Sequence, residues 1–222
     1  MTAEHTGIVI RQTKITGGRR MILVFTRDAG KISAGTRISE RKGGGGALAI
    51  RPFAYGRYFV REGANGFFSI TSAETIDAHF ALGGDADRFA EASFALEFTD
   101  RLLPEGIPAQ NIFDLLRRYL TLLCARESDF RLLTISYMVK VMQDTGVFPD
   151  AVSSADFPEN ELLSGVNDDI FTQIVFLAEN PLERMAGLTF NREKEGAVFT
   201  ILTEFARRHL DIGMLKSEKL LL

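Results

Sequence analysis

The sequence predicts a two-domain α+β fold, in which a small five-stranded barrel precedes an all-α helical domain. Three observations predict it. Short β-rich runs separated by turn signals fill roughly the first 80 residues. The apolar period then changes from strand-like to helix-like near residue 83. The positive charge is concentrated in the first of these two parts. We therefore assign residues 1–82 to the barrel and residues 83–222 to the helical domain.

Five runs rich in β-branched and aromatic residues follow one another in the first domain. They are separated by turn signals such as Thr16-Gly17-Gly18 and Ala64-Asn65-Gly66, and Asn-Gly is a strong hairpin signal. Short strands joined by tight turns favour a closed or partly open barrel over a parallel sheet. The runs are GIVIRQTKI, RMILVFTR, KISAGTRI, AIRPFAYGRYFVREG and FFSITSAE, with a loop from Ser39 to Gly46 between the third and the fourth.

Helical spacing of apolar residues begins after Gly83-Gly84, where Asp85 is the expected N-cap of the first helix. Residues 149–168 are polar and irregular, which is long for a loop in a compact domain. The expected helical segments are Asp85 to Leu103, Pro108 to Leu123, Ser128 to Gly146, a stretch from Asn180 and a last helix from Arg192 to Leu210.

The net charge of -3 hides a strong asymmetry. Residues 7–61 hold twelve Lys and Arg against two acids, so this stretch carries +10 and the remainder of the chain carries -13. Such a split predicts one half that binds a polyanion. No apolar run is long enough to cross a bilayer, and the N-terminal residues do not form a signal peptide, so we expect a cytoplasmic protein that does not bind membranes.

We expect the basic barrel to bind nucleic acid through the phosphate backbone, because small barrels combine cations for phosphates with aromatic residues for stacking. Phe53, Tyr55 and Phe59 share one parity with Arg57 and Arg61, so an unbulged strand would place them on one face. These aromatic residues, and also Phe25 and Tyr58, belong either to the barrel core or to such a face. The expected DNA-binding residues are Arg11, Lys14, Arg19, Arg20, Arg27, Lys31, Arg37, Arg41, Lys42 and Arg57.

Signals for catalysis, metals and cofactors are weak. Cys124 is the single cysteine, and the three histidines lack ligand-forming neighbours, so we expect no metal site. The run Gly43–Gly46 does not match a phosphate-binding loop, and no nucleophile stands beside a base. We therefore expect a protein that is not an enzyme and uses no cofactor. In the helical domain, Arg117, Arg118 and Arg131 are either a patch for an acidic partner peptide or scattered surface charge.

The stretch GIVIRQTKITGGRRMILVFTRDAGKISAGTRISERK resembles the N-terminus of the bacterial RecO family, and the resemblance continues through the last barrel strand and at the final LKSEKLLL. It implies an N-terminal OB-fold and a helical domain that bind single- and double-stranded DNA and anneal complementary strands. It also implies partners, namely RecR and the acidic C-terminal tail of single-strand binding protein, through which RecA is loaded in the RecF pathway at the nucleoid. The barrel cations that match the family pattern are Arg11, Arg19, Arg20, Arg27, Lys31, Arg37, Arg41 and Lys42.

The chain departs from the family pattern in one place. Many members carry a four-cysteine zinc module after a G-x-x-P turn, and this chain keeps the turn at Gly146-Val147-Phe148-Pro149 but continues as DAVSSADFPENELLSG. Zinc is therefore not expected. The leading hypothesis is a mediator of recombinational repair, and the alternative is an adaptor whose main partner is a protein and which binds DNA only weakly.

Overall fold

The computed structural model of the chain describes residues 2–38, 45–128, 130–148, 168–187 and 191–221. It divides into two compact units. The barrel unit consists of residues 1–84 and 103–120, and the helical unit consists of residues 85–102 and 121–222. The segment 103–120, which we expected in the helical domain, therefore belongs with the barrel.

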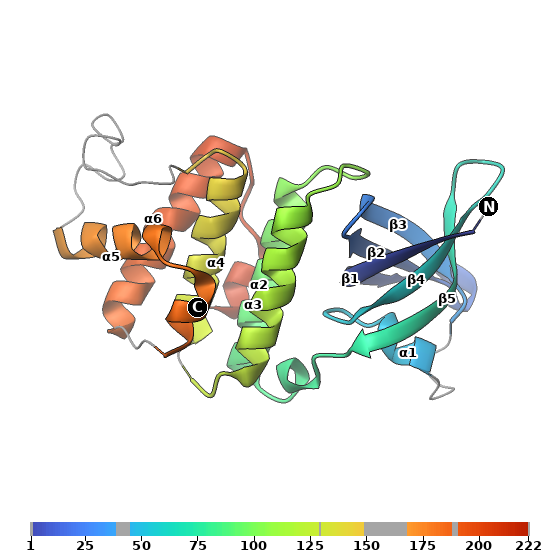
Figure 1. The fold of residues 1–222 in the computed structure, drawn as a ribbon, viewed down its shortest axis with the longest axis horizontal. Helices are drawn as coiled ribbons and strands as arrows, with labels where there is room; N and C mark the ends of the chain where they lie inside the picture. The colour runs from blue at the N-terminus through green and yellow to red at the C-terminus, as the bar shows by residue number, and fades with distance from the viewer. Residues whose placement is uncertain (1, 39–44, 129, 149–167, 188–190, 222) are drawn as a thin grey trace. The chain divides into compact units, whose positions relative to one another are not determined.

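The five strands form a closed barrel in the order β1-β2-β3-β5-β4 (Figure 1). The first half of β1 pairs with β4 and its second half pairs with β2, while β3 and β5 are the parallel pair. A five-stranded barrel of this kind is an OB-fold, and the predicted α+β two-domain class is confirmed. The strands are β1 (Thr2–Lys14), β2 (Arg20–Thr26), β3 (Gly30–Thr36), β4 (Tyr55–Glu62) and β5 (Phe68–Asp77).

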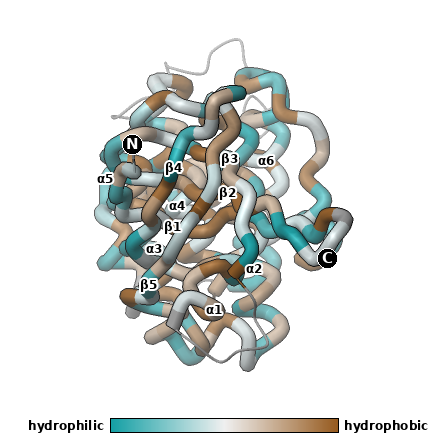
Figure 2. Tube along the Cα trace, turned by 90° about the vertical axis from the view of Figure 1, so that its right-hand side faces the viewer, coloured by the Kyte–Doolittle hydropathy of each residue, from teal (hydrophilic) through white to brown (hydrophobic). Residues whose placement is uncertain are grey.

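The interior of the barrel is filled by the residues that alternate inward along each strand. Figure 2 shows hydrophobic and hydrophilic residues interspersed along the strands and helices. The core consists of Val9, Ile22, Val24, Ile32, Ala34, Ala49, Ile50, Tyr58, Val60, Ile70 and Ala73.

A short helix, α1 (Gly45–Ala49), stands where the sequence predicted a loop and the start of the fourth strand. The strand β4 begins only at Tyr55. Phe53 lies before it with a φ of 72°, in the left-handed region, and its N–H donates to the carbonyl of Val9 at 3.0 Å. The unbulged strand that would place Phe53 on one face with Tyr55 and Phe59 is therefore not formed, because the chain turns between α1 and β4; Phe53 is buried, which is the core alternative.

The segment that follows the helix α2 (Ala86–Leu102) packs against the beginning of β3, within the barrel unit. The N–H of Gly106 donates to the carbonyl of Lys31 at 3.0 Å. Gly30 has a φ of +69°, and a Cβ there would lie 2.3 Å from the carbonyl oxygen of Ile107. Glycine is required at this position both by the backbone conformation and by the close approach of a second chain segment.

The helix α3 (Gln110–Ala125) continues from this segment and places Phe113 against the outside of the barrel. Its ring meets Phe25 edge-on at 5.5 Å between centroids, and it lies 6.4 Å from the ring of Tyr55. Phe25 is fully buried as a result. The outer face of the barrel is thus covered at the end where β2 finishes and β3 begins.

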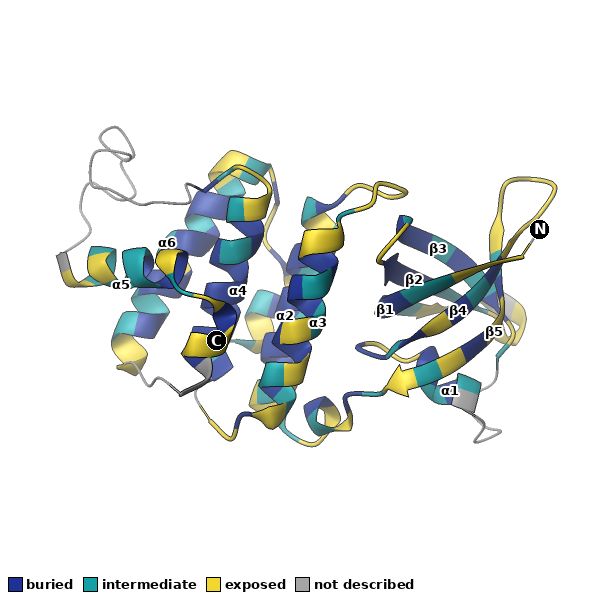
Figure 3. Ribbon diagram, in the orientation of Figure 1, coloured by how far each residue is buried: buried dark blue, intermediate teal, exposed yellow. Residues whose placement is uncertain are grey.

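In the helical unit, α4 (Phe130–Asp144) is the central element and packs against α2, α5 (Asp168–Glu179) and α6 (Arg192–Leu210). Most of α4 is buried, whereas the turn between β4 and β5 is exposed (Figure 3). The stretch expected to be helical from Asn180 is a 3₁₀ helix at Leu182–Gly187. The predicted irregular loop lies almost wholly outside the described residues.

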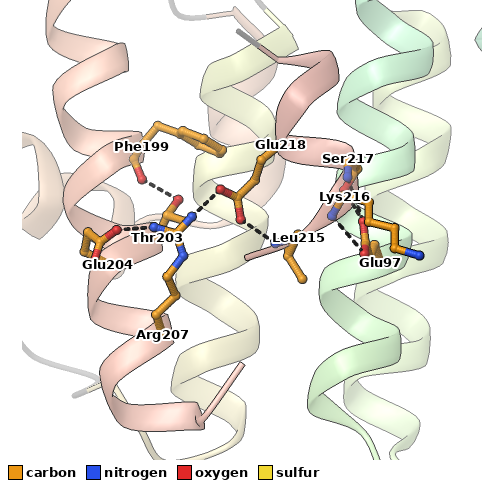
Figure 4. A network of polar contacts seen from close by, with 9 residues as sticks. All are labelled: Glu97, Phe199, Thr203, Glu204, Arg207, Leu215, Lys216, Ser217 and Glu218. Carbon is orange, nitrogen blue, oxygen red and sulfur yellow. Dashed lines mark hydrogen bonds and ion pairs between the residues drawn. The ribbon is translucent and has the colours of Figure 1, made fainter. Parts of the chain in front are cut away.

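The C-terminal segment is held against α2 and α6 by a network of polar contacts (Figure 4). The carboxylate of Glu97 accepts hydrogen bonds from the backbone N–H groups of Lys216 and Ser217, at 3.0 and 2.8 Å, and from the Ser217 hydroxyl at 2.7 Å. Arg207 forms ion pairs with Glu204 and Glu218. This network fixes the 3₁₀ helix Lys216–Leu220. Among the described residues, no helix has the length and hydropathy that crossing a bilayer requires.

Candidate nucleic-acid interface

Two neighbouring turns bring four basic residues to one end of the barrel. Lys14, the last residue of β1, pairs with Arg20, the first residue of β2. Arg20 also pairs with Thr36 at the end of β3, and Arg37 follows directly. Arg19, Lys14 and Arg37 are exposed, and Arg20 is half-buried. We call these four residues the basic end, and all four were predicted from the sequence.

Arg20 is oriented by hydrogen bonds. One of its terminal nitrogens donates to Gln12 Oε1 at 2.9 Å, and Gln12 Nε2 donates to the carbonyl of Ile50 at 2.9 Å. Arg51 follows Ile50 and is exposed. It adds a basic residue that the sequence analysis counted among the twelve cations but did not select. Its link to the basic end depends on a contact between residues 38 positions apart, which no sequence pattern indicates.

The exposed aromatic residues beside the basic end are not among those that the sequence analysis named. Phe25, Phe53 and Tyr58 are buried, Tyr58 in the barrel core and Phe25 beneath Phe113, while Tyr55 and Phe59 are half-buried. Phe67 and Phe68 are instead 72% and 40% exposed, in the β4–β5 turn and at the start of β5. The parallel register sets Phe68 beside Ala34, two residues before Thr36 on β3. The double phenylalanine after the Asn-Gly turn was a signal that could have identified them.

Three of the predicted DNA-binding residues are either paired with an acid of the same chain or buried. Arg27 donates two hydrogen bonds to the Asp114 carboxylate, at 3.2 and 3.0 Å, and this contact lowers the pKa of Asp114. Arg57 forms an ion pair with Glu74 at 2.7 Å. Lys31 is only 6% exposed, beside the segment that covers the start of β3. These cations contribute less to a surface for phosphates than their sequence positions suggest.

Of the remaining predicted DNA-binding residues, one lies beside the basic end and two lie outside the described residues. Arg11 is exposed on β1 and pairs with Leu23 of β2, so it extends the basic end along the outer side of the sheet. Arg41 and Lys42 lie outside the described residues. The structure thus gathers five of the ten predicted residues along one border of the barrel, namely Arg11, Lys14, Arg19, Arg20 and Arg37.

OB-folds bind oligonucleotides on the face of their second and third strands and with the loops that flank it. In this chain, Phe113 covers Phe25 and the segment around Gly106 covers Lys31, so one half of that face is occupied. Toward the β1–β2 turn, Met21, Ser33 and Gly35 remain half-exposed. The open half of the face therefore adjoins the basic end.

The three arginines considered for an acidic partner peptide fall in separate units. Arg117 and Arg118 lie on α3 within the barrel unit, and both help to lower the pKa of Asp114 after the larger effect of Arg27. Arg131 lies in the helical unit and donates to Glu91 Oε1 at 2.5 Å and to the carbonyl of Leu221 at 2.8 Å. Arg131 is thus engaged with groups of its own unit.

The sequence predicts that the chain holds no metal ion, and the absence of a metal site stays a prediction. Across the described residues, no three His, Cys, Asp or Glu side chains are grouped so that they could hold a metal ion. The stretch that replaces the zinc module falls outside these residues.

Comparison with known proteins identifies the family. The model for the N-terminal part of recombination protein O matches residues 1–79, and the model for its C-terminal part matches residues 83–169. Together they cover well over half of the chain, and each falls on one of the two predicted domains.

Several similar proteins are named DNA repair protein RecO. The one from Alkaliphilus metalliredigens is 25% identical over 69% of this chain and 62% of its own length. The one from Anaeromyxobacter dehalogenans strain 2CP-1 is 33% identical over 55% of this chain and 49% of its own length. In both, the match spans less than two thirds of the relative. A third, from Caldanaerobacter subterraneus subsp. tengcongensis, is 22% identical over 92% of both chains. The predicted family is confirmed, and the chain belongs to the RecO family of DNA repair proteins.

Proposed function

We propose that this chain is a mediator of DNA repair and recombination that binds single- and double-stranded DNA without reading its sequence. It promotes annealing of complementary strands and, with RecR and the acidic tail of single-strand binding protein, the loading of RecA in the RecF pathway. It acts in the cytoplasm at the nucleoid, is not an enzyme and needs no cofactor. The observation that carries the DNA-binding part is the convergence of Lys14, Arg19, Arg20 and Arg37 at one end of the barrel.

The chemistry of this border suits a flexible single strand. Guanidinium and ammonium groups contact phosphates, while exposed aromatic rings stack on unpaired bases of any identity. Phe67 and Phe68 supply such rings beside the cations. The border consists of strand ends and turns. The described helical elements beside it, the 3₁₀ turn Thr16–Gly18 and α1, have three and five residues, which is too short to lie in a groove and read base edges. Binding should therefore be independent of sequence.

The first test is a titration of labelled single-stranded oligonucleotide followed by fluorescence anisotropy. The variant Arg19→Ala with Arg37→Ala removes two exposed cations of the basic end. It should weaken binding by roughly tenfold at low salt, equally for oligonucleotides of different sequence. The matched control is Arg208→Ala with Lys219→Ala, which makes the same charge change on exposed residues of the helical unit. Equal losses in the two double variants would contradict the assigned surface.

The mediator role is tested separately by the rate at which two complementary strands pair. The unmodified chain and the control variant should accelerate annealing, and the basic-end variant should not. A chain that binds DNA tightly yet leaves the annealing rate unchanged would be a passive binder rather than a mediator.

One observation favours the alternative hypothesis of an adaptor whose main partner is a protein. Arg27 and Arg57 are paired with Asp114 and Glu74, so part of the positive charge of the barrel is already neutralised within the chain. The adaptor hypothesis predicts weak DNA binding even at about 50 mM salt, where contacts to the phosphate backbone are strong. The titration described above therefore separates the two hypotheses.

A further inference from the structure

Two adjacent residues of α3 occupy the outer face of the barrel unit at the end of β2. The ring of Phe113 meets Phe25 edge-on at 5.5 Å between centroids. The carboxylate of Asp114 accepts two hydrogen bonds from Arg27, at 3.2 and 3.0 Å. All four residues belong to one compact unit. A ring and an anion are also the two groups that a nucleotide offers to an OB-fold, since bases stack on aromatic side chains and phosphates pair with cations.

The two residues of α3 differ in how firmly they are held. Phe113 is 1% exposed and Phe25 is fully buried, so the two rings are part of the packing of the unit. In contrast, the side chains of Arg27 and Asp114 are 50% and 35% exposed. An exposed ion pair contributes little to stability, because water and salt screen it. The ring of Phe113 is therefore a fixed part of this face, whereas another anion can take the place of the Asp114 carboxylate.

Exchange with another ion, rather than loss of a proton, is the way to open this pair near neutral pH. The hydrogen bond to Asp114 and its negative charge raise the pKa of Arg27. The hydrogen bond from Arg27 is in turn the largest of the effects that lower the pKa of Asp114. Both groups therefore stay ionised, and a competing ion is needed to separate them.

The surroundings of Asp114 favour an anion as the competitor. Arg117 and Arg118 lie three and four positions further along α3, which places them on the same side of the helix as Asp114. Their positive charges also lower the pKa of Asp114. Three guanidinium groups thus act on one carboxylate, and a phosphate in its place would be attracted by the same three cations.

We propose that Arg27 is a phosphate subsite of the DNA-binding face, which Asp114 occupies until a phosphate of the nucleic acid displaces it. This inference rests on the proposed function, because it assumes that DNA lies along the face of β2 and β3. Arg20 is the first residue of β2 and Arg27 follows its last residue, so the subsite lies about 23 Å from the basic end. A single strand of several nucleotides can span that distance, within the roughly 4–16 nucleotides that one OB-fold binds.

The experiment measures binding of a labelled single-stranded oligonucleotide to the full chain by fluorescence anisotropy at several salt concentrations. Asp114→Asn keeps the size of the side chain and removes its charge, and it should strengthen binding about fivefold at low salt. It should also steepen the slope of log K against log salt by about 0.7, because one more cation of the barrel then releases a counterion.

The matched control is Glu105→Gln, which removes one negative charge from an exposed residue of the same chain segment. It should change the affinity by less than about twofold, because salt screens a charge that lies away from the subsite. A further variant combines Asp114→Asn with Arg27→Ala. Against Arg27→Ala alone, it should strengthen binding by less than about twofold, since the arginine that Asp114 occupies is gone.

The proposal is overturned if Asp114→Asn and Glu105→Gln strengthen binding equally, or if Asp114→Asn gives the same gain with and without Arg27. It is also overturned if Asp114→Asn lowers the Tm but leaves DNA binding unchanged, which would assign the ion pair to the packing of α3 alone. Stronger binding of a poly-glutamate peptide by Asp114→Asn, without stronger DNA binding, would assign the subsite to an acidic partner protein instead.

Failure of this proposal is distinguishable from failure of the proposed function. If the unmodified chain binds DNA and Arg19→Ala with Arg37→Ala weakens it, but Asp114→Asn has no effect, only the subsite is wrong. If neither the unmodified chain nor Asp114→Asn binds DNA, both proposals are wrong.

Discussion

The Tyr58 hydroxyl joins α1, the turn that follows it and β4 at a single point. The side chain is fully buried, and its hydroxyl donates to the carbonyl of Ala49 at 2.7 Å, with the carbonyl of Ala54 at 3.2 Å. Burial raises the pKa of this phenol, so it remains a neutral donor at physiological pH. The contact explains how a five-residue helix and a left-handed Phe53 are held at the end of the barrel.

Tyr58→Phe should lower the free energy of unfolding by about 1–3 kcal/mol, because the carbonyl of Ala49 loses the hydroxyl donor while the ring volume is kept; the carbonyl of Ala54 keeps the N–H of Val9. Urea denaturation followed by circular dichroism measures this change. The control Tyr55→Phe alters a half-buried residue of the same strand and should change stability by less than about 0.5 kcal/mol. Equal effects of the two substitutions would show that the buried hydroxyl does not matter.

The sequence could identify cations but not what they contact. Lys14 and Arg20 flank a turn that the glycines of residues 16–18 reveal, so their closeness was predictable. The sequence could not show that Arg27, unlike Lys14 and Arg20, is paired with an acid, because its partner Asp114 lies 87 residues further along the chain. The burial of Lys31 likewise depends on a segment that begins more than 70 positions later. Long-range pairing is the information that a local pattern lacks.

At the level of elements, the strands and most helices were predictable because each carries its own period and its own turn signals. The last helix runs from Arg192 to Leu210 as expected, and Asp85 accepts the N–H of Arg88 as an N-cap should. The helix α1 was missed because five residues are too few to show a helical period and two of them are glycines. Short elements are set by tertiary contacts rather than by their own sequence.

The β4–β5 hairpin should contribute to single-strand binding through its exposed ring. Phe67→Ala should weaken binding of single-stranded DNA by about 1–3 kcal/mol, the usual size of a lost base stack, and should affect duplex DNA less. Phe80→Ala is the matched control, because that ring is 70% exposed but lies outside the hairpin. Anisotropy titrations with both kinds of DNA measure the difference. An equal loss for single strands and duplex would contradict stacking.

The contact between α2 and the C-terminal 3₁₀ helix should depend on pH. Burial raises the pKa of Glu97, but the hydrogen bonds from Ser217 and Lys216 outweigh it, and the pKa lies below its ordinary value. A carboxyl with a lowered folded-state pKa stabilises the fold above its unfolded pKa, and the contribution is lost as the pH falls through the folded value.

Glu97→Gln should therefore lower the Tm at neutral pH, and the difference from the unmodified chain should shrink as the solution is acidified below about pH 4.5. Differential scanning calorimetry across this range measures it. Glu62→Gln, on an exposed residue, should leave the Tm nearly unchanged throughout. A difference that is constant with pH would show that the charge of Glu97 is not what holds the C-terminal segment.

At the level of the whole molecule, the uneven charge is the property that links sequence to function. A chain with a net charge of -3 would repel DNA as a whole, yet residues 7–61 carry +10. Because salt limits the reach of an exposed charge to about 10 Å, the local surface decides the outcome. We therefore expect that the acids of the helical unit do not prevent DNA binding at the basic end.

The salt dependence of single-strand binding tests the central claim most directly. If the four cations of the basic end each contact a phosphate, log K should fall with log salt with a slope of about -3. Arg19→Ala with Arg37→Ala should flatten that slope by about 1.4, while Arg208→Ala with Lys219→Ala should not change it. A slope near zero, or equal slopes for the basic-end variant and the unmodified chain, would contradict the account.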